Sequence, residues 1–219
     1  MARGGRAGVA WPGFEDDHRR VNHASYFVTQ GGAGPPVLLL HGFPQTHHCW
    51  HRVAPALAST HRVVAPDLKG LGASTAPAGG VRGEGYTKRE VAGEMVQLMR
   101  ELGHEQFAVV GHDRGARVAE YRRAMTPDTI AAVCADYRAS YYHDREHDTV
   151  DRQAGRRITV PLLAVTGQAE TQLAFAPEVW RSWASDLETA VVPGGHFLPE
   201  EAPDALIELL LAFLQPGRG

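Results

Sequence analysis

Residues 107–115 read Phe-Ala-Val-Val-Gly-His-Asp-Arg-Gly, and this stretch decides the fold. Phe107–Val110 is a continuous apolar run, which is typical of a parallel strand buried on both faces. The chain then passes through a tight turn between Gly111 and Gly115 into a helix-like segment, Ala116–Met125. The flanking glycines suit such a turn, because a β-carbon there would collide with the neighbouring backbone. A strand that turns directly into a helix is expected to present Asp113 at the carboxyl end of the sheet.

The remaining pattern alternates strands and helices. Four further apolar runs each end in a glycine or a polar residue, and two helices are indicated by the capping box Thr87–Glu90 and by the tail Ala205–Leu214. This alternation predicts one α/β domain over residues 1–219, with a mostly parallel sheet, helices on both faces and frayed ends at 1–13 and 216–219. The four runs are Val37–Leu40, Arg62–Ala65, Leu162–Thr166 and Thr189–Val192.

Composition excludes several classes of protein. The 219 residues are 43% apolar, with 22 Lys and Arg against 25 Asp and Glu, so no basic excess favours a nucleic-acid partner. No apolar run is long enough for a bilayer, and the first residues lack the apolar segment of a secretory signal. The two cysteines, Cys49 and Cys134, have no metal-ligand spacing. We therefore expect a cytoplasmic protein that binds neither membrane nor nucleic acid.

Catalytic residue types follow three of the predicted strands. His41-Gly42-Phe43-Pro44 follows the first apolar run, and His196 follows the last in Gly194-Gly195-His196-Phe197. Asp113 alone could simply cap its helix. The order of nucleophile, then histidine near the C-terminus, instead predicts an α/β-hydrolase site in which Asp113 is the nucleophile and His196 the base.

Over Phe14–Leu214 the chain resembles the haloacetate (fluoroacetate) dehalogenases of the α/β-hydrolase superfamily. Gly-His-Asp-Arg-Gly-Ala-Arg distinguishes this family from epoxide hydrolases, which usually carry Trp after the nucleophilic Asp. The matching blocks are His41–His47, Pro66–Ser74, Phe107–Val118, Asp136–Ala139, Ala154–Leu163 and Gly195–Pro203.

The resemblance implies a reaction on a small halogenated carboxylate. Asp113 would displace halide and form an ester, which water activated by His196 would hydrolyse. Backbone N–H groups of Phe43 and Arg114 would form the oxyanion hole, and the side chains of Arg114 and Arg117 would clamp the substrate carboxylate. Alternatively, both arginines simply lie on a solvent-exposed face of the helix and bind no substrate. No cofactor is implied, and no metal site is expected, because the adjacent histidines of His47–His51 do not share a helix face.

The chain departs from the family after the predicted helix Ala116–Met125. Members of the family carry an inserted helical segment, the cap, after this helix. Here Glu120–Met125 leads directly into Thr126-Pro127-Asp128, and Asp128–Ala139 resembles the family's sequence beyond most of the cap. We therefore expect the cap to be largely absent. Its loss would expose apolar surface, which favours a homodimer.

The sequence offers two candidates for the acidic residue that orients His196. If Ile130–Asp136 is a strand, Asp136 ends it and supplies the acid. If Pro127 begins a helix there, the stripe Ile130, Val133, Cys134 and Tyr137 forms its apolar face, and Glu170, three residues past Gly167, is the candidate acid. The helix is the favoured interpretation.

Two other functions compete with dehalogenation. One is hydrolysis of epoxides or other small substrates at an open site, although Tyr141 and Tyr142 are adjacent and lie outside any clear cap that could use them as acids. The other is a non-catalytic remnant that binds carboxylates through Arg114 and Arg117.

Overall fold

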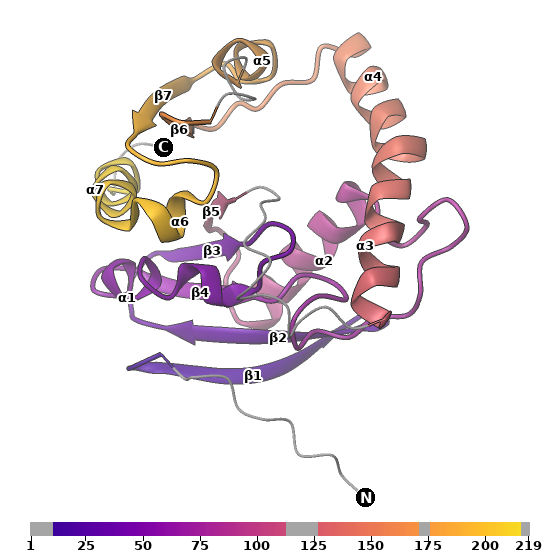
Figure 1. The fold of residues 1–219 in the computed structure, drawn as a ribbon, viewed down its shortest axis with the longest axis horizontal. Coiled ribbons are helices and arrows are strands. Elements are labelled where there is room, and N and C mark those ends of the chain that lie inside the picture. The colour runs from indigo at the N-terminus through magenta and orange to yellow at the C-terminus, as the bar shows by residue number, and fades with distance from the viewer. Residues whose placement is uncertain (1–10, 113–126, 171–175, 216–219) are drawn as a thin grey trace, which may run out of the picture.

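The structure is a computed structural model that describes residues 11–112, 127–170 and 176–215 (Figure 1). Five strands form one mixed sheet in the order β1-β2-β4-β3-β5, and β6 pairs with β7 in parallel. β3 is parallel to both β4 and β5, whereas β1, β2 and β4 pair antiparallel. The strands are β1 (Phe14–Val21), β2 (Ala24–Gly31), β3 (Pro36–Leu40), β4 (Arg62–Pro66), β5 (Ala108–Gly111), β6 (Leu162–Gly167) and β7 (Leu187–Val192).

Helices lie on both sides of this sheet, as an α/β fold requires (Figure 1). Three consecutive segments, α3 (Pro127–Ala139), η3 (Ser140–Asp144) and α4 (Arg145–Gln153), form one long helical rod. The other helices are η1 (His47–Trp50), α1 (Ala54–Leu57), α2 (Lys88–Glu101), α5 (Ala176–Trp183), α6 (Leu198–Glu201) and α7 (Pro203–Phe213).

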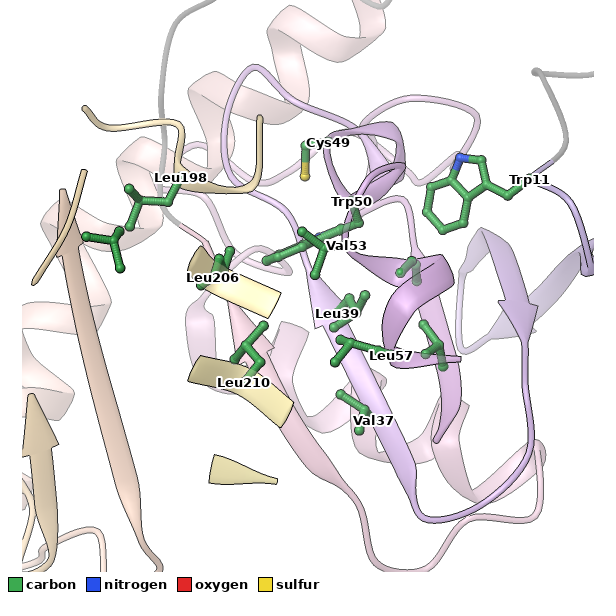
Figure 2. Packing of buried hydrophobic residues seen from close by; sticks show 14 residues of the cluster. Trp11, Val37, Leu39, Cys49, Trp50, Val53, Leu57, Leu198, Leu206 and Leu210 are labelled. Carbon is green, nitrogen blue, oxygen red and sulfur yellow. The ribbon is translucent and has the colours of Figure 1, made fainter. Parts of the chain in front are cut away.

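The alternation of side chains along β3 divides the core into two layers. Val37 and Leu39 point to one face, where they pack with η1, α1, α6 and α7 (Figure 2). Leu38 points to the other face and packs with Met95 and Leu98 of α2. The first cluster also contains Val192 of β7, so burial of apolar surface ties the β6–β7 pair to the larger sheet.

Most of the expected elements are confirmed. All five predicted strands are present within a residue or two, and Thr87 and Glu90 form the predicted reciprocal capping box at the start of α2. The β1–β2 hairpin was not anticipated, because the edge strand β1 carries charged residues without a clear apolar alternation. Trp11 lies within the segment 1–13 that the sequence predicts to be frayed, but it is buried and packs edge-on against Phe14.

Residues 127–139 form a helix, so the strand interpretation of Ile130–Asp136 is wrong. The predicted apolar face of this helix is also wrong, because Ile130 and Tyr137 are each 49% exposed. The buried face consists of small residues, Thr129, Ala132, Ala135 and Ala139.

Small side chains are buried here because α3 lies directly on a glycine-containing loop. A β-carbon on Gly83 would lie 2.2 Å from the Ala135 carbonyl oxygen, and one on Gly70 would lie 2.5 Å from the Ala132 Cβ. Such close approach admits alanine and glycine and excludes larger residues. Within the described part of the chain, no helix has the length and apolarity needed to cross a bilayer.

Candidate active site

The carboxyl ends of the parallel strands carry the candidate catalytic residues. His41 follows β3, His112 follows β5, Glu170 follows β6 and His196 follows β7. Parallel strands bring their carboxyl ends to one edge of a sheet, which is where α/β folds build their ligand crevices. Asp113, Arg114 and Arg117, the predicted nucleophile and carboxylate clamp, lie outside the described residues.

His196 and Glu170 are brought into direct contact. The His196 Nδ1 lies 2.8 Å from the Glu170 Oε2. The two loops that carry them are held by backbone bonds, with the Ala169 N–H donating to the Gly194 carbonyl at 2.9 Å. Gly167 permits this approach, since a β-carbon there would lie 2.1 Å from the Gly195 carbonyl oxygen.

The other ring nitrogen of His196 is available for chemistry. Its Nε2 atom is buried and has no hydrogen-bond partner among the described residues. When Nδ1–H donates to a carboxylate, Nε2 carries the lone pair and can accept a proton. A carboxylate on one nitrogen and a vacant acceptor on the other is the arrangement that a general base requires.

Asp136, the alternative acid, occupies a different place. It lies on α3 and forms an ion pair with Lys88 of α2. The strand that would have carried Asp136 toward His196 does not exist. The structure therefore pairs His196 with Glu170, and Asp136 loses the basis on which it was considered.

The loop after β3 is anchored by a buried histidine. The His41 Nδ1–H donates to the Gly42 carbonyl at 2.7 Å, and the Leu68 N–H donates to His41 Nε2 at 2.8 Å. Burial lowers the pKa of His41 below its usual value, in keeping with a neutral ring that accepts one bond and donates the other. This ring fixes the backbone that leads to Phe43, the residue predicted to supply an oxyanion-hole N–H.

Asp67 directly follows β4 and anchors the same loop through His47. Its carboxylate accepts bonds from the His47 backbone N–H, the His47 ring and the Ala73 N–H, each at 2.7 Å. Burial alone would raise the pKa of Asp67, but the bond and charge of His47 together with the Ala73 N–H outweigh it, so the net pKa is lowered. Asp67 is thus held as a carboxylate that ties two loops together.

A second polar network was not anticipated from the sequence. The His112 ring bonds Gln45 Oε1 through Nδ1 at 2.7 Å and the His196 carbonyl through Nε2 at 2.6 Å. Gln45 is buried, and its Nε2 donates to Glu200 Oε2 at 2.9 Å. Nothing in the spacing of these residues indicates that they meet, because 67 positions separate Gln45 from His112.

A cavity of about 200 Å³ opens beside this edge of the sheet. Its wall is mostly apolar, but Lys69 is nearly buried and donates to Glu94 Oε1 at 2.8 Å. Tyr26 donates to the other oxygen of Glu94 at 2.5 Å, and burial, followed by the nearby Glu94, raises the pKa of that tyrosine. Residues of α3 form part of the wall, so α3 partly covers the cavity. The lining includes Phe43, Lys69, Tyr86, Lys88, His112 and Tyr137.

Comparisons with known proteins agree with this architecture. A family model described as the alpha/beta hydrolase fold matches residues 35–136. A fluoroacetate dehalogenase from a Burkholderia species is 29% identical over 297 residues, which covers 94% of this chain and 95% of the relative. A soluble epoxide hydrolase from Corynebacterium is 44% identical over 96 residues, but the match spans only 44% of this chain and 32% of that protein.

Solved structures are similar over nearly the whole chain. An α/β-hydrolase-type protein from Nostoc is 30% identical with a TM-score of 0.85, covering 94% of this chain and 99% of that one. A candidate epoxide hydrolase from Pseudomonas aeruginosa is 32% identical with a TM-score of 0.83, covering 95% and 97% of the two chains.

Proposed function

This chain belongs to the α/β-hydrolase family, and on that basis we propose that it hydrolyses the carbon–halogen bond of small halogenated carboxylates such as haloacetates. The observation that carries the proposal is the His196–Glu170 pair, in which His196 Nε2 has no hydrogen-bond partner among the described residues. The second support is the sequence Gly111-His112-Asp113-Arg114-Gly115, which puts a carboxylate where related hydrolases have their nucleophile. The fluoroacetate dehalogenase relative, aligned over almost its full length, supports the same substrate class.

The first proposed step is a displacement. A carboxylate oxygen of Asp113 attacks the saturated carbon that bears the halogen, a carbon–oxygen bond forms, and halide leaves with the electron pair of the broken bond. The guanidinium groups of Arg114 and Arg117 hold the substrate carboxylate, whose planar geometry their paired donors match. The product of this step is an ester on Asp113 and a free halide ion.

The second proposed step is hydrolysis of that ester. His196 Nε2 takes a proton from water, and the oxygen of the water attacks the ester carbonyl carbon of Asp113. The oxyanion accepts hydrogen bonds from backbone N–H groups of Phe43 and Arg114. The intermediate collapses as His196 returns the proton to the departing alkoxide, which releases the hydroxy acid and leaves Asp113 as a carboxylic acid. Loss of that proton to solvent restores the Asp113 carboxylate. Glu170 stabilises the ring of His196 while the ring is charged.

We further propose that the helical cap of such enzymes is largely missing here. The alignment with the Burkholderia relative runs over 297 residues, more than the 219 residues of this chain, so that relative has positions with no counterpart here. The separation of β6–β7 from the five-stranded sheet fits the loss of a segment between β5 and β6. In this arrangement α3 forms part of the wall of the cavity.

The test is to trap the ester. His196→Asn should leave the displacement intact and block hydrolysis, so incubation with bromoacetate should leave a carboxymethyl group on the peptide that contains Asp113, detected by mass spectrometry. Bromoacetate also alkylates accessible thiols and Cys134 is exposed, so all variants should carry Cys134→Ser. Adding Asp113→Ala provides the matched control and should abolish the adduct on that peptide.

A second readout follows the oxygen atoms. In a single turnover of the otherwise unmodified chain in isotopically labelled water, the label should enter the Asp113 carboxylate and be absent from the hydroxy acid. Label in the product alone would mean that water attacks the substrate directly, and the proposal would be wrong. Carboxylate binding without any adduct would instead favour a non-catalytic carboxylate-binding protein.

Hydrolysis of small epoxides is the second candidate function. The epoxide hydrolase relatives support it, and so do two tyrosines, Tyr86 and Tyr137, that line the cavity where ring-opening acids would be needed. The pair considered from the sequence, Tyr141 and Tyr142, is instead 64% and 47% exposed and does not belong to the cavity lining. Formation of diol from a small epoxide, measured beside bromide release from bromoacetate, separates the two activities.

A further inference from the structure

His112 stands at the end of β5, directly before Asp113, and both of its ring nitrogens face oxygen atoms. Nδ1 lies 2.7 Å from Gln45 Oε1, and Nε2 lies 2.6 Å from the backbone carbonyl oxygen of His196. A neutral imidazole has one N–H donor and one acceptor, whereas the protonated ring donates from both nitrogens. The character of the two oxygens therefore decides the charge of His112.

Both oxygens can only accept. A backbone carbonyl has no hydrogen to donate, so Nε2 must carry the proton toward His196. The amide of Gln45 is oriented by Glu200, because its Nε2 donates to the Glu200 carboxylate at 2.9 Å. Turning that amide over would set its oxygen against the carboxylate and repel it, so the Gln45 oxygen faces His112 and Nδ1 must also donate.

From this geometry we infer that His112 is a permanent imidazolium at neutral pH, and that it positions the catalytic histidine. Its Nε2–H holds the backbone of His196, and its charge lies beside the His196 ring, with the two ring centroids 5.4 Å apart. Holding that backbone keeps the His196 ring where its Nδ1 meets the Glu170 carboxylate. This functional consequence rests on the proposed hydrolysis, whereas the charge of His112 does not.

The charged and titratable groups around His112 come from several elements. Glu200 of α6, reached through Gln45, supplies a compensating negative charge, and Glu170 after β6 faces His196 rather than His112. His41 after β3 remains neutral, because burial, with a smaller contribution from the charge of His112, lowers its pKa. The cation is therefore linked to the Glu200 carboxylate through a buried amide that relays the interaction.

Nuclear magnetic resonance of the full chain with nitrogen-15-labelled histidine tests the charge directly. We expect both ring nitrogens of His112 to show the shifts of a protonated imidazole at about pH 7.5, one unit above the about 6.5 at which ordinary histidine titrates. His112 is assigned through correlations with its own backbone. A neutral tautomer at that pH in the unmodified chain would overturn the inference.

Two variants identify the source of the charge. Glu200→Gln should move the His112 titration to lower pH by at least one unit, because the compensating carboxylate is gone. The matched control, Glu105→Gln, removes a highly exposed carboxylate and should leave the titration unchanged. Equal shifts in the two variants would mean that overall charge, and not the Gln45 relay, sets the protonation of His112.

The consequence for catalysis has its own readout. His112→Gln should slow ester hydrolysis, because the His196 backbone loses the bond that holds it, and should leave ester formation nearly unchanged, because the displacement does not require His196. A merely structural role would slow both steps to the same extent, and that result would overturn the positioning role. The resonance experiment needs no turnover, so a chain that fails to release halide refutes the proposed function while the charge of His112 is judged separately.

Discussion

Glu170 and Asp136 are the two carboxylates that could orient His196, and their surroundings predict opposite effects of mutation. Glu170→Gln keeps the shape of the side chain but removes the charge that stabilises the protonated His196 ring. We expect ester hydrolysis to slow by about 10²–10⁴-fold, while formation of the ester changes little, since the displacement does not require His196. Rapid-quench measurements with bromoacetate should show the ester accumulating.

Asp136→Asn is the matched control for this prediction. Asp136 pairs with Lys88 and lines the cavity beside Ala132, in a position where we expect it to tune only the wall of the cavity. In Asp136→Asn the ratio of the rate constants for ester formation and ester hydrolysis should stay within about threefold of its value in the unmodified chain. A half-exposed ion pair contributes little to stability, so its loss should disturb the site little. Ester accumulation in Asp136→Asn but not in Glu170→Gln would show that the orienting acid has been assigned wrongly.

The packing of α3 depends on a contact between a helix of small residues and a glycine loop. Gly83 has a φ of +89° and meets Ala135, whereas Gly85 has a φ of +85° and a β-carbon placed on it would have no neighbour within 4 Å. Gly83→Ala and Gly85→Ala therefore impose the same backbone strain, about 1–2 kcal/mol. Only Gly83→Ala also pushes α3 away from the loop.

We expect Gly83→Ala to lower the free energy of unfolding by about 1–3 kcal/mol more than Gly85→Ala does. Urea denaturation of the two variants measures this difference with the strain of the left-handed backbone cancelled. It should be accompanied by weaker substrate binding in Gly83→Ala, since α3 forms part of the cavity wall. Equal destabilisation by the two variants would mean that α3 is not held against this loop.

The described part of the chain leaves strand edges unpaired and apolar side chains exposed. β5 pairs only with β3 and β6 only with β7 among the described strands, and Val109 and Val191 are 56% and 68% exposed. Such surface favours association, so a homodimer stays a prediction for this chain. Exposure to solvent would also slow departure of the halide, because a leaving halide needs a dry pocket with several hydrogen-bond donors.

Fluoride should therefore be released far more slowly than bromide. Fluoride is the poorer leaving group, and each donor lost with a cap costs on the order of 10²–10³ in rate. Binding of small carboxylates should survive, because the sequence retains Arg114 and Arg117. Ion-selective measurement of both halides from fluoroacetate and bromoacetate, with one preparation of the chain, tests this expectation. Comparable rates would mean that a working leaving-group pocket exists without the cap.

The sequence by itself determined the features that depend on local interactions. The apolar runs at Val37–Leu40 and Leu162–Thr166 predicted strands, and both strands form. The prediction that both are buried holds for β3, whereas residues 162–166 of β6 are only partly buried. The start of α2 was equally readable, since Thr87 and Glu90 satisfy each other's backbone N–H groups within one turn. The order of the strand ends predicted which residues would gather at one edge of the sheet.

Only the tertiary structure decided which of these residues touch and which helix face is buried. From the sequence, Glu170 and Asp136 are both possible partners of His196. In the structure the close approach of Gly167 and Gly195 brings two loops together, and His196 contacts Glu170. The face of α3 was misassigned because close contact with glycine backbone favours alanine over the larger Ile130 and Tyr137. Likewise, the charge of His112 depends on Gln45 and Glu200, which approach it from distant parts of the chain. Polar pairing and close backbone approach are set by three-dimensional distance, and residue spacing along one chain does not encode that distance.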